Sequence, residues 1–250
     1  MTLKVKNVTG GYSNIPVLKG ISFEVKAGQL VGLIGLNGAG KSTTINHIIG
    51  LLTPHQGTIT IDGVSLQQDP KLYKQKIAYI PETPVLYEEL TLKEHLELTM
   101  MAYDLEPKKA WQDAQKLLET FRLANKLDWF PANFSKGMKQ KVMIVCAFLT
   151  QAQLFIIDEP FLGLDPLATR DLLTLIEEKK QAGAAVLMST HVLSTAQSVC
   201  DQFVLIDQGQ IKAIGTMEQL QANYGQTDES LADIYLTMTQ EGQKNGATMA

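Results

Sequence analysis

A run of small residues, followed by a lysine and two hydroxyl side chains, stands near the start of the chain. It comprises Gly35, Leu36, Asn37, Gly38, Ala39, Gly40, Lys41, Ser42 and Thr43. The spacing matches the P-loop pattern, in which glycines let backbone N–H groups turn toward a phosphate chain. Lys41 supplies a charge for the β and γ phosphates, and the Ser42 hydroxyl is a hard oxygen that suits Mg²⁺. The run therefore predicts a site for a nucleoside triphosphate and Mg²⁺.

A second group of reactive side chains follows a four-residue apolar run at 154–157. Asp158 ends this predicted strand, where its carboxylate is available to a magnesium ion. Glu159 comes next and has the chemistry to polarise an attacking water as a general base. The alternative for each acid is that it caps a helix at a strand-to-helix turn. His191 follows another core strand, where it either contacts the γ-phosphate or is an ordinary satisfied polar residue.

The predicted elements that position these side chains alternate between buried strands and helices. Leu30–Ile34 is apolar and has the length of a buried strand, and a helix that begins near Gly40 directs its positive end at the phosphates. Residues 1–29 alternate like an antiparallel ribbon. The pattern from 91 to 126 is helical with a break near Pro107, and 231–239 is a helix before a disordered end. We expect an α/β fold with a mainly parallel core sheet, an antiparallel ribbon and a helical insertion.

Composition limits the class of protein and its location. The chain has 250 residues and a net charge of −4, which gives no electrostatic footprint for nucleic acid. Its apolar stretches are far shorter than the ~20 residues that span a bilayer. We also expect no signal peptide, because the first residues run straight into a strand pattern. The expected location is cytoplasmic, with membrane contact only through a partner.

The order of these segments resembles the nucleotide-binding subunits of ABC transporters. The distinguishing motif is 134–138, Phe-Ser-Lys-Gly-Met, at the start of a helix. In that family this helix end completes the ATP site of a second copy, so the resemblance implies that Ser135 and Gly137 bind the nucleotide across a dimer. It also implies an ABC-type P-loop NTPase domain over 1–220, with the helical insertion at about 84–150. Residues 221–250 then form a C-terminal helix and tail.

The resemblance assigns roles to several further residues. Tyr12 would stack on adenine, an alternative to a packed loop aromatic, and His191 would be the γ-phosphate switch. Glu82 would bind Mg²⁺ with Ser42 and Asp158 and begin the loop that communicates with a membrane-spanning subunit. Segment 164–165 would line the dimer interface. The catalytic set is then Glu159, His191 and Lys41.

The chain departs from the family pattern at three positions. Lys136 replaces a usual Gly, Met138 a usual Gln, and Glu82 a usual Gln. Lys136 either approaches the phosphate or faces water, and Met138 lacks the polar contacts of Gln. These changes affect details of the site.

The segments 79–91, 129–131 and 161–166 narrow the resemblance to the ATPase subunits of Ecs-type transporters of Gram-positive bacteria. This implies a peripheral position on the inner face of the cell membrane and an exporter connected with peptides or protein secretion. Two alternatives stay open. One is a soluble ABC ATPase that handles nucleic acid or protein assembly without a transporter, and the other is a P-loop GTPase or kinase. The acidic balance disfavours a nucleic-acid partner, and the acid pair at 158–159 disfavours the second alternative.

Overall fold

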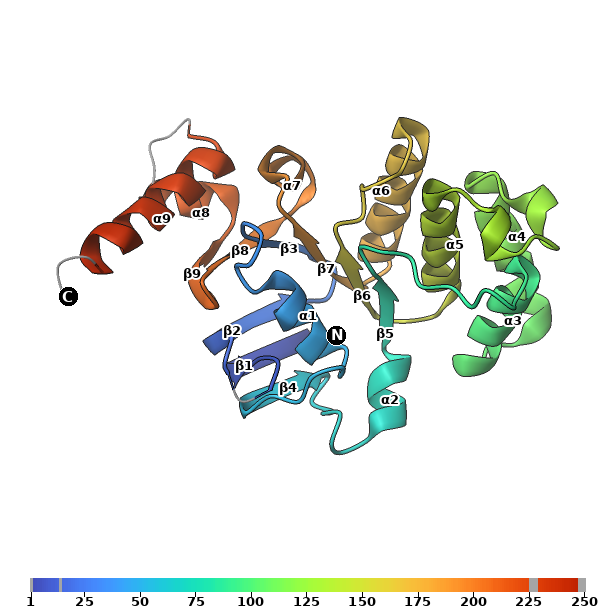
Figure 1. The fold of residues 1–250 in the computed structure, drawn as a ribbon, viewed down its shortest axis with the longest axis horizontal. Helices are drawn as coiled ribbons and strands as arrows, with labels where there is room; N and C mark the ends of the chain where they lie inside the picture. Colours follow the sequence, from blue (N-terminus) through green and yellow to red (C-terminus); the bar gives the residue numbers. More distant parts are fainter. Residues whose placement is uncertain (1, 14, 225–228, 247–250) are drawn as a thin grey trace.

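A six-stranded sheet runs through the centre of the molecule (Figure 1). The computed structural model describes residues 2–13, 15–224 and 229–246. In sheet order the strands are β5 (Ile77–Ile80), β6 (Leu154–Asp158), β7 (Ala185–Thr190), β3 (Leu30–Ile34), β8 (Gln202–Asp207) and β9 (Gln210–Gly215). All neighbours are parallel except β8 and β9, which form an antiparallel hairpin. The predicted mainly parallel core sheet is confirmed.

A separate three-stranded antiparallel sheet packs below the core sheet. Its strands are β1 (Thr2–Gly10), β2 (Leu18–Lys26) and β4 (Gln56–Ile61), in the order β2-β1-β4. Helix α1 (Lys41–Ile48) lies between the two sheets and buries Ile45 and Ile48 in their shared apolar cluster. This confirms the predicted antiparallel ribbon and extends it by β4.

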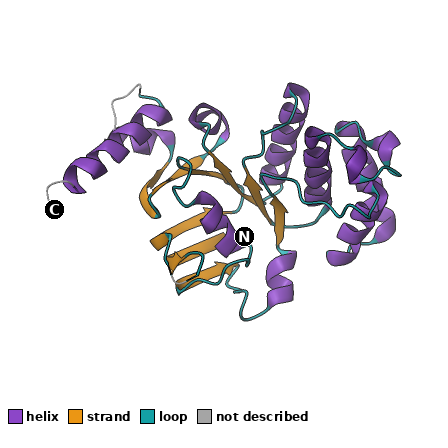
Figure 2. Ribbon diagram, in the orientation of Figure 1, coloured by secondary structure: helices purple, strands orange, loops and turns teal. Residues whose placement is uncertain are grey.

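The helical insertion forms the end of the molecule that is farthest from the C-terminal helices (Figure 2). It contains α3 (Leu92–Ala102), α4 (Pro107–Thr120) and α5 (Lys136–Leu149), with short 3₁₀ turns at Ala124–Lys126 and Pro131–Asn133. The predicted break near Pro107 is present, since Glu106 caps α4 and proline occupies its first turn. Helix α2 (Pro70–Gln75) precedes β5.

The remaining helices cover the core sheet and carry the chain to its C-terminal region. They are α6 (Pro166–Gln181), α7 (Leu193–Val199), α8 (Met217–Tyr224) and α9 (Leu231–Gly246). The expected end of the last helix at Thr239 is wrong, because α9 continues to Gly246. The sequence there contains Gln, Glu and Lys, which favour helix, and no proline. The tail at 247–250 lies outside the described residues, and the domain boundary at residue 220 stays a prediction.

The alternation of side chains along each core strand explains the layered structure. On β6, Leu154 and Ile156 face the antiparallel sheet, while Phe155 and Ile157 face the cluster that contains α5 and α6. Both faces of the core sheet are therefore covered, as expected for parallel strands. No helix of the described residues combines the length and apolar character that a membrane crossing requires.

Candidate nucleotide-binding and hydrolysis site

The carboxyl ends of three neighbouring strands bring the predicted reactive residues to one edge of the sheet. In the strand register, Ile34 at the end of β3 pairs with Thr190 of β7, and Asp158 of β6 pairs with Ser189. The P-loop follows β3, Glu159 follows β6 and His191 follows β7. Because the strands are parallel, segments more than a hundred residues apart in the chain end side by side.

The P-loop depends on glycine where its backbone turns into α1. Gly40 has φ of 114°, a left-handed conformation at the cap of the helix that begins with Lys41. Gly35 has no room for a side chain, since a Cβ there would lie 2.5 Å from the Ile206 carbonyl oxygen. The backbone of α1 therefore presents its N-terminal end at a fixed position above the sheet edge.

The three residues predicted to take part in catalysis lie in contact. The Nζ of Lys41 lies 3.8 Å from Oε1 of Glu159, and both side chains are only 8% exposed. The Nδ1 of His191 lies 2.8 Å from the same carboxylate oxygen, and the Thr190 hydroxyl donates to the other oxygen at 3.1 Å. Glu159 is held at φ of 46°, a strained conformation for a residue other than glycine. Its carboxylate is thus aimed by hydrogen bonds and by the backbone.

Asp158 lies beneath Glu159 and is buried. The Ser189 hydroxyl donates a hydrogen bond to its carboxylate. Burial raises the pKa of Asp158 above its ordinary value, and the charges of Glu82 and Glu159 raise it further, although the Ser189 bond and Lys41 oppose this. Three carboxylates near one lysine are an environment that a divalent cation would stabilise.

The donor set near these carboxylates fits Mg²⁺. Ser42 is exposed at the start of α1, and Glu82 lines the same pocket. Hydroxyl and carboxylate oxygens are the ligands that Mg²⁺ prefers, and nucleotide phosphates commonly supply the others. In the part of the chain that the structure describes, no three His, Cys, Asp or Glu side chains form a metal cage of their own. The geometry therefore suits an ion that arrives with its nucleotide.

A pocket of about 400 Å³ opens above this edge. It is lined by Tyr12, Val17, Asn37, Gly38, Gly40, Lys41, Ser42, Thr43, Glu82, Glu159 and His191. The Tyr12 ring is 54% exposed, and its hydroxyl accepts a hydrogen bond of 3.1 Å from the Asn46 amide on α1. A half-exposed aromatic ring that is tethered at the mouth of a phosphate site is placed well for stacking on a base.

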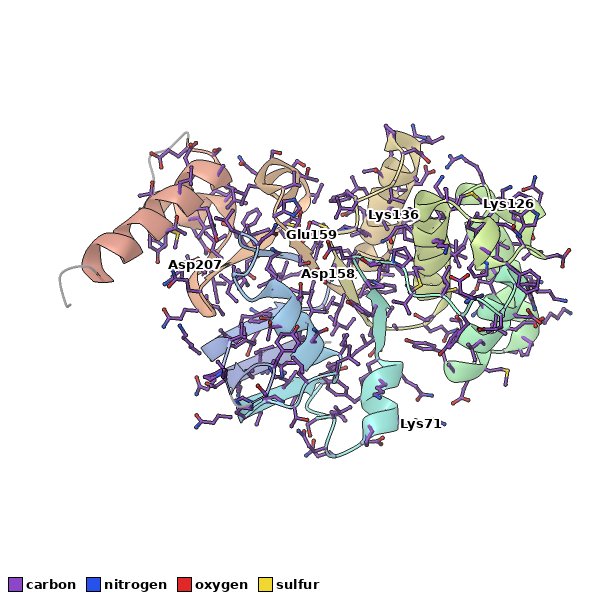
Figure 3. The ribbon with its side chains drawn as sticks, viewed as in Figure 1. Lys71, Lys126, Lys136, Asp158, Glu159 and Asp207 are labelled. Carbon is purple, nitrogen blue, oxygen red and sulfur yellow. The ribbon has the colours of Figure 1, made fainter. Side chains whose placement is uncertain are left out.

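Ser135 and Gly137 do not line this pocket. Ser135 caps α5 by accepting a 3.3 Å bond from the Met138 N–H, and Figure 3 shows Lys136 on α5, apart from Asp158 and Glu159. Gly137 lies against the turn before α6, where an added Cβ would be 2.4 Å from the Gly163 carbonyl oxygen. The two predicted nucleotide contacts thus belong to a different surface of the same chain.

The three departures from the family pattern have different surroundings. Lys136 is exposed at the first position of α5, so its ammonium group is in water in the single chain. Met138 is half-buried against the apolar cluster of the helical insertion, where a hydrophobic side chain packs. Glu82 is exposed and lines the pocket.

Several residues that support the site were not predicted. Asn46 holds Tyr12, while Ser189 and Thr190 hold the two carboxylates. Ser189 and Thr190 could have been predicted, because they directly precede His191 and end a strand beside β6. Tyr235 on α9 contacts the P-loop at a separation of 199 residues, and no local pattern marks such a contact.

Comparisons with known proteins cover most of the chain. A family model described as "ABC transporter" matches residues 18–162. The ABC-type transporter ATP-binding protein EcsA of Bacillus subtilis (strain 168) is 56% identical over 239 residues, 96% of this chain and 97% of that protein. A solved ATP-binding subunit of an ABC transporter matches with a TM-score of 0.93 and 53% identity, over 96% of this chain and all of that one. The ATP-binding cassette MJ0796, solved as a dimer in a post-hydrolysis state with ADP and Pi, matches with a TM-score of 0.77 and 25% identity, over 86% and 98% of the two chains.

Proposed function

The chain belongs to the ATP-binding subunits of ABC transporters, and from that premise we propose that it is a motor that hydrolyses ATP to drive transport across a membrane. Two copies would close around two ATP molecules, each site combining the P-loop of one copy with Ser135 and Gly137 of the other. The separation of these two residues from the chain's own pocket is the observation that carries the proposal. A pocket that is half complete in one chain gains its missing contacts from a second copy.

The geometry supports a division of labour in hydrolysis. Glu159 accepts the proton of an attacking water, since it is the buried carboxylate that faces the pocket. Lys41 binds the β and γ phosphates, and His191, held against Glu159, contacts the γ-phosphate. Ser42, Asp158 and Glu82 would hold Mg²⁺, which when bound neutralises phosphate charge.

Light scattering during size-exclusion chromatography tests the dimer. The variant is Glu159→Gln, which keeps the shape of the side chain and removes the base, and it is measured with and without Mg-free ATP. We expect a monomer that becomes a dimer only with ATP, because ATP binds the closed state fully. Adding Lys41→Ala to the same variant is the matched control and should keep it monomeric. A monomer that has demonstrably bound ATP would contradict self-assembly and point to the membrane subunit, or to a half-site weakened by Lys136 and Met138.

We also propose that the loop after Glu82 docks a separate membrane-spanning subunit. Val85 is 74% exposed and Tyr87 is 62% exposed, an apolar surface directly after a residue that lines the pocket. The loop is anchored at both ends, because Gln140 donates to the Pro81 carbonyl at 3.3 Å and the Tyr87 N–H donates to His95 Nε2 at 3.0 Å. A conformational change at Glu82 would therefore be transmitted to a partner bound on this surface.

From the same family membership we propose that the chain works at the inner face of the cell membrane, in an exporter linked to peptides or protein secretion. This finer assignment rests on the Ecs-type resemblance. The alternative is an ABC ATPase that is not coupled to a transporter. Affinity purification from membranes in mild detergent separates the two, with Val85→Asp as the matched variant. Capture of a membrane-spanning protein that is lost in the variant supports the transporter, and its absence in both samples supports the alternative.

A further inference from the structure

Helix α9 packs against the part of the core that carries the P-loop. Its residues Leu231, Ile234, Tyr235 and Met238, spaced as one helical face, share an apolar cluster with Ile34, the residue just before the P-loop. Figure 1 shows α8 and α9 at the end of the molecule beside β8 and β9, opposite the helical insertion. The C-terminal helix is therefore an integral part of this side of the core.

The side chain of Tyr235 connects this helix to the P-loop. It is only 2% exposed, and its hydroxyl lies between two backbone groups. The Leu36 N–H donates to the hydroxyl at 3.1 Å, and the hydroxyl donates to the Ile206 carbonyl at 3.2 Å. A phenol has one proton to donate and an oxygen that accepts, so both capacities are used.

The peptide unit between Gly35 and Leu36 is held on both of its sides. Its N–H donates to Tyr235, while its carbonyl accepts a 2.8 Å bond from Nζ of Lys41. The orientation of this one peptide plane thus couples the phenol to the ammonium group. A rotation of the plane would move the carbonyl that helps to place the Lys41 charge in the pocket.

Helix α9 also contacts the segment that follows His191. The Leu231 N–H donates to the Gln197 side chain of α7 at 2.9 Å. Because α7 begins two residues after His191, α9 is tied to two of the turns that form the site.

We propose that Tyr235 is a positioning residue for nucleotide binding, which fixes the first peptide of the P-loop and, through it, the ammonium group of Lys41. The inference rests on nucleotide binding at the P-loop. It gives the C-terminal helix a role in tuning the affinity for phosphates.

The test replaces the hydroxyl alone, with Tyr235→Phe. The ring still fills its place, but the Leu36 N–H and the Ile206 carbonyl lose their shared partner. We expect the Kd for MgADP, measured by calorimetry, to rise about fivefold, the order expected for one lost hydrogen bond that supports binding. The KM for ATP should rise similarly, with little change in kcat. If the substitution only lowered stability, fewer molecules would be folded and active. The apparent kcat would then fall and KM would be unchanged.

Tyr73→Phe is the matched control. Tyr73 is 1% exposed and its hydroxyl donates to the Ile48 carbonyl at 2.7 Å, at the far end of α1 from the phosphates. The variant Tyr73→Phe therefore loses a buried hydrogen bond of a tyrosine hydroxyl, but the peptide between Gly35 and Leu36 keeps its hydrogen bonds. We expect its Kd for MgADP to match the unaltered chain.

The possible failures are distinguishable. If the unaltered chain binds neither ATP nor ADP, the proposed function fails. If it binds them and Tyr235→Phe has the same Kd as Tyr73→Phe, the positioning role is overturned.

A second measurement applies if Tyr235→Phe does not fold. Hydrogen exchange of the unaltered chain is followed with and without saturating MgADP. Since coupling between two sites is reciprocal, nucleotide should slow exchange in residues 231–238 as well as in the P-loop. Protection of the P-loop with none in α9 would also overturn the proposal.

Discussion

The contact between Gly137 and Gly163 gives a sharp prediction for the variant Gly137→Ala. An added Cβ at residue 137 would lie 2.4 Å from the Gly163 carbonyl oxygen, whereas ordinary contacts begin at 3.4 Å. The obstacle is backbone and not a flexible side chain, so the start of α5 and the turn before α6 must separate by about 1 Å. That turn leads into Asp165, the cap of α6, in the segment expected to line the dimer interface.

We expect the substitution Gly137→Ala to lower both the stability of the fold and the ATPase activity. Overpacking of this kind typically costs about 1–3 kcal/mol of unfolding free energy. In the proposed dimer the same shift misplaces Ser135 and residue 137 against the partner's nucleotide, and a displacement of about 1 Å can reduce a rate by ~10². Nucleotide binding to the single chain should be unchanged, because Gly137 does not line that pocket.

The assay compares steady-state ATPase activity with the Kd for ATP in the single chain. Gly20→Ala is the control for stability, since Gly20 has φ of 69° with nothing within 4 Å of an added Cβ. Its cost is backbone strain of about 1–2 kcal/mol, and Gly20 does not line the pocket. We expect ~10²-fold lower ATPase activity in Gly137→Ala, and nearly full activity in Gly20→Ala. Full ATPase activity in Gly137→Ala would contradict the proposal that this surface contacts the nucleotide of a second copy. A loss of ATP affinity as large as the loss of ATPase activity would contradict it too.

Two further predictions concern the carboxylates. Glu159→Gln should lower turnover by ~10² to 10⁴ and retain ATP binding, since a general base contributes about that much; unchanged turnover would remove Glu159 from this role. Asp158→Asn should raise the melting temperature of the nucleotide-free chain at pH 7. Because the folded-state pKa of Asp158 lies above its unfolded value of 3.8, its stabilising contribution is complete below that pH and is lost as pH rises through the folded pKa. The difference in melting temperature should therefore shrink as pH falls toward 4, and a constant difference from pH 4 to 8 would contradict this sign.

The sequence predicted the parts of the site that depend on local chemistry. Glycines and a lysine after an apolar run allow little besides a phosphate-binding turn, and the family membership and the Ecs-type resemblance are confirmed. The elements were equally predictable where caps mark them, as at Asp165 and Pro166, which begin α6. The end of α9 was not, because the residues after Thr239 are polar and helical propensity alone is a weak signal.

Contacts across long sequence separations could not be predicted. In the sequence pattern, Tyr235 occupies one apolar position of an amphipathic helix. Only the folded core brings its hydroxyl within hydrogen-bond distance of the Leu36 N–H. Similarly, the requirement for glycine at residue 137 comes from the Gly163 carbonyl, which belongs to another turn. The roles assigned to Tyr12, Glu82, Ser135 and His191 stay predictions, although the structure brings all but Ser135 to one pocket.

The carboxylates in and beside the pocket oppose the binding of an anionic nucleotide to a single chain. Lys41 shares the pocket lining with two carboxylates, Glu82 and Glu159, and the buried Asp158 interacts electrostatically with all three. Lys41 already donates to the Gly35 carbonyl and pairs with Glu159, so its charge is partly used. Added cations would offset these carboxylates. Mg²⁺ would supply part of this charge, and the proposed second copy would bring the positive end of α5 with Lys136 at its first turn. In the proposed dimer, nucleotide, metal and second copy would therefore stabilise one another, which is the coupling that ATP-dependent dimerisation needs.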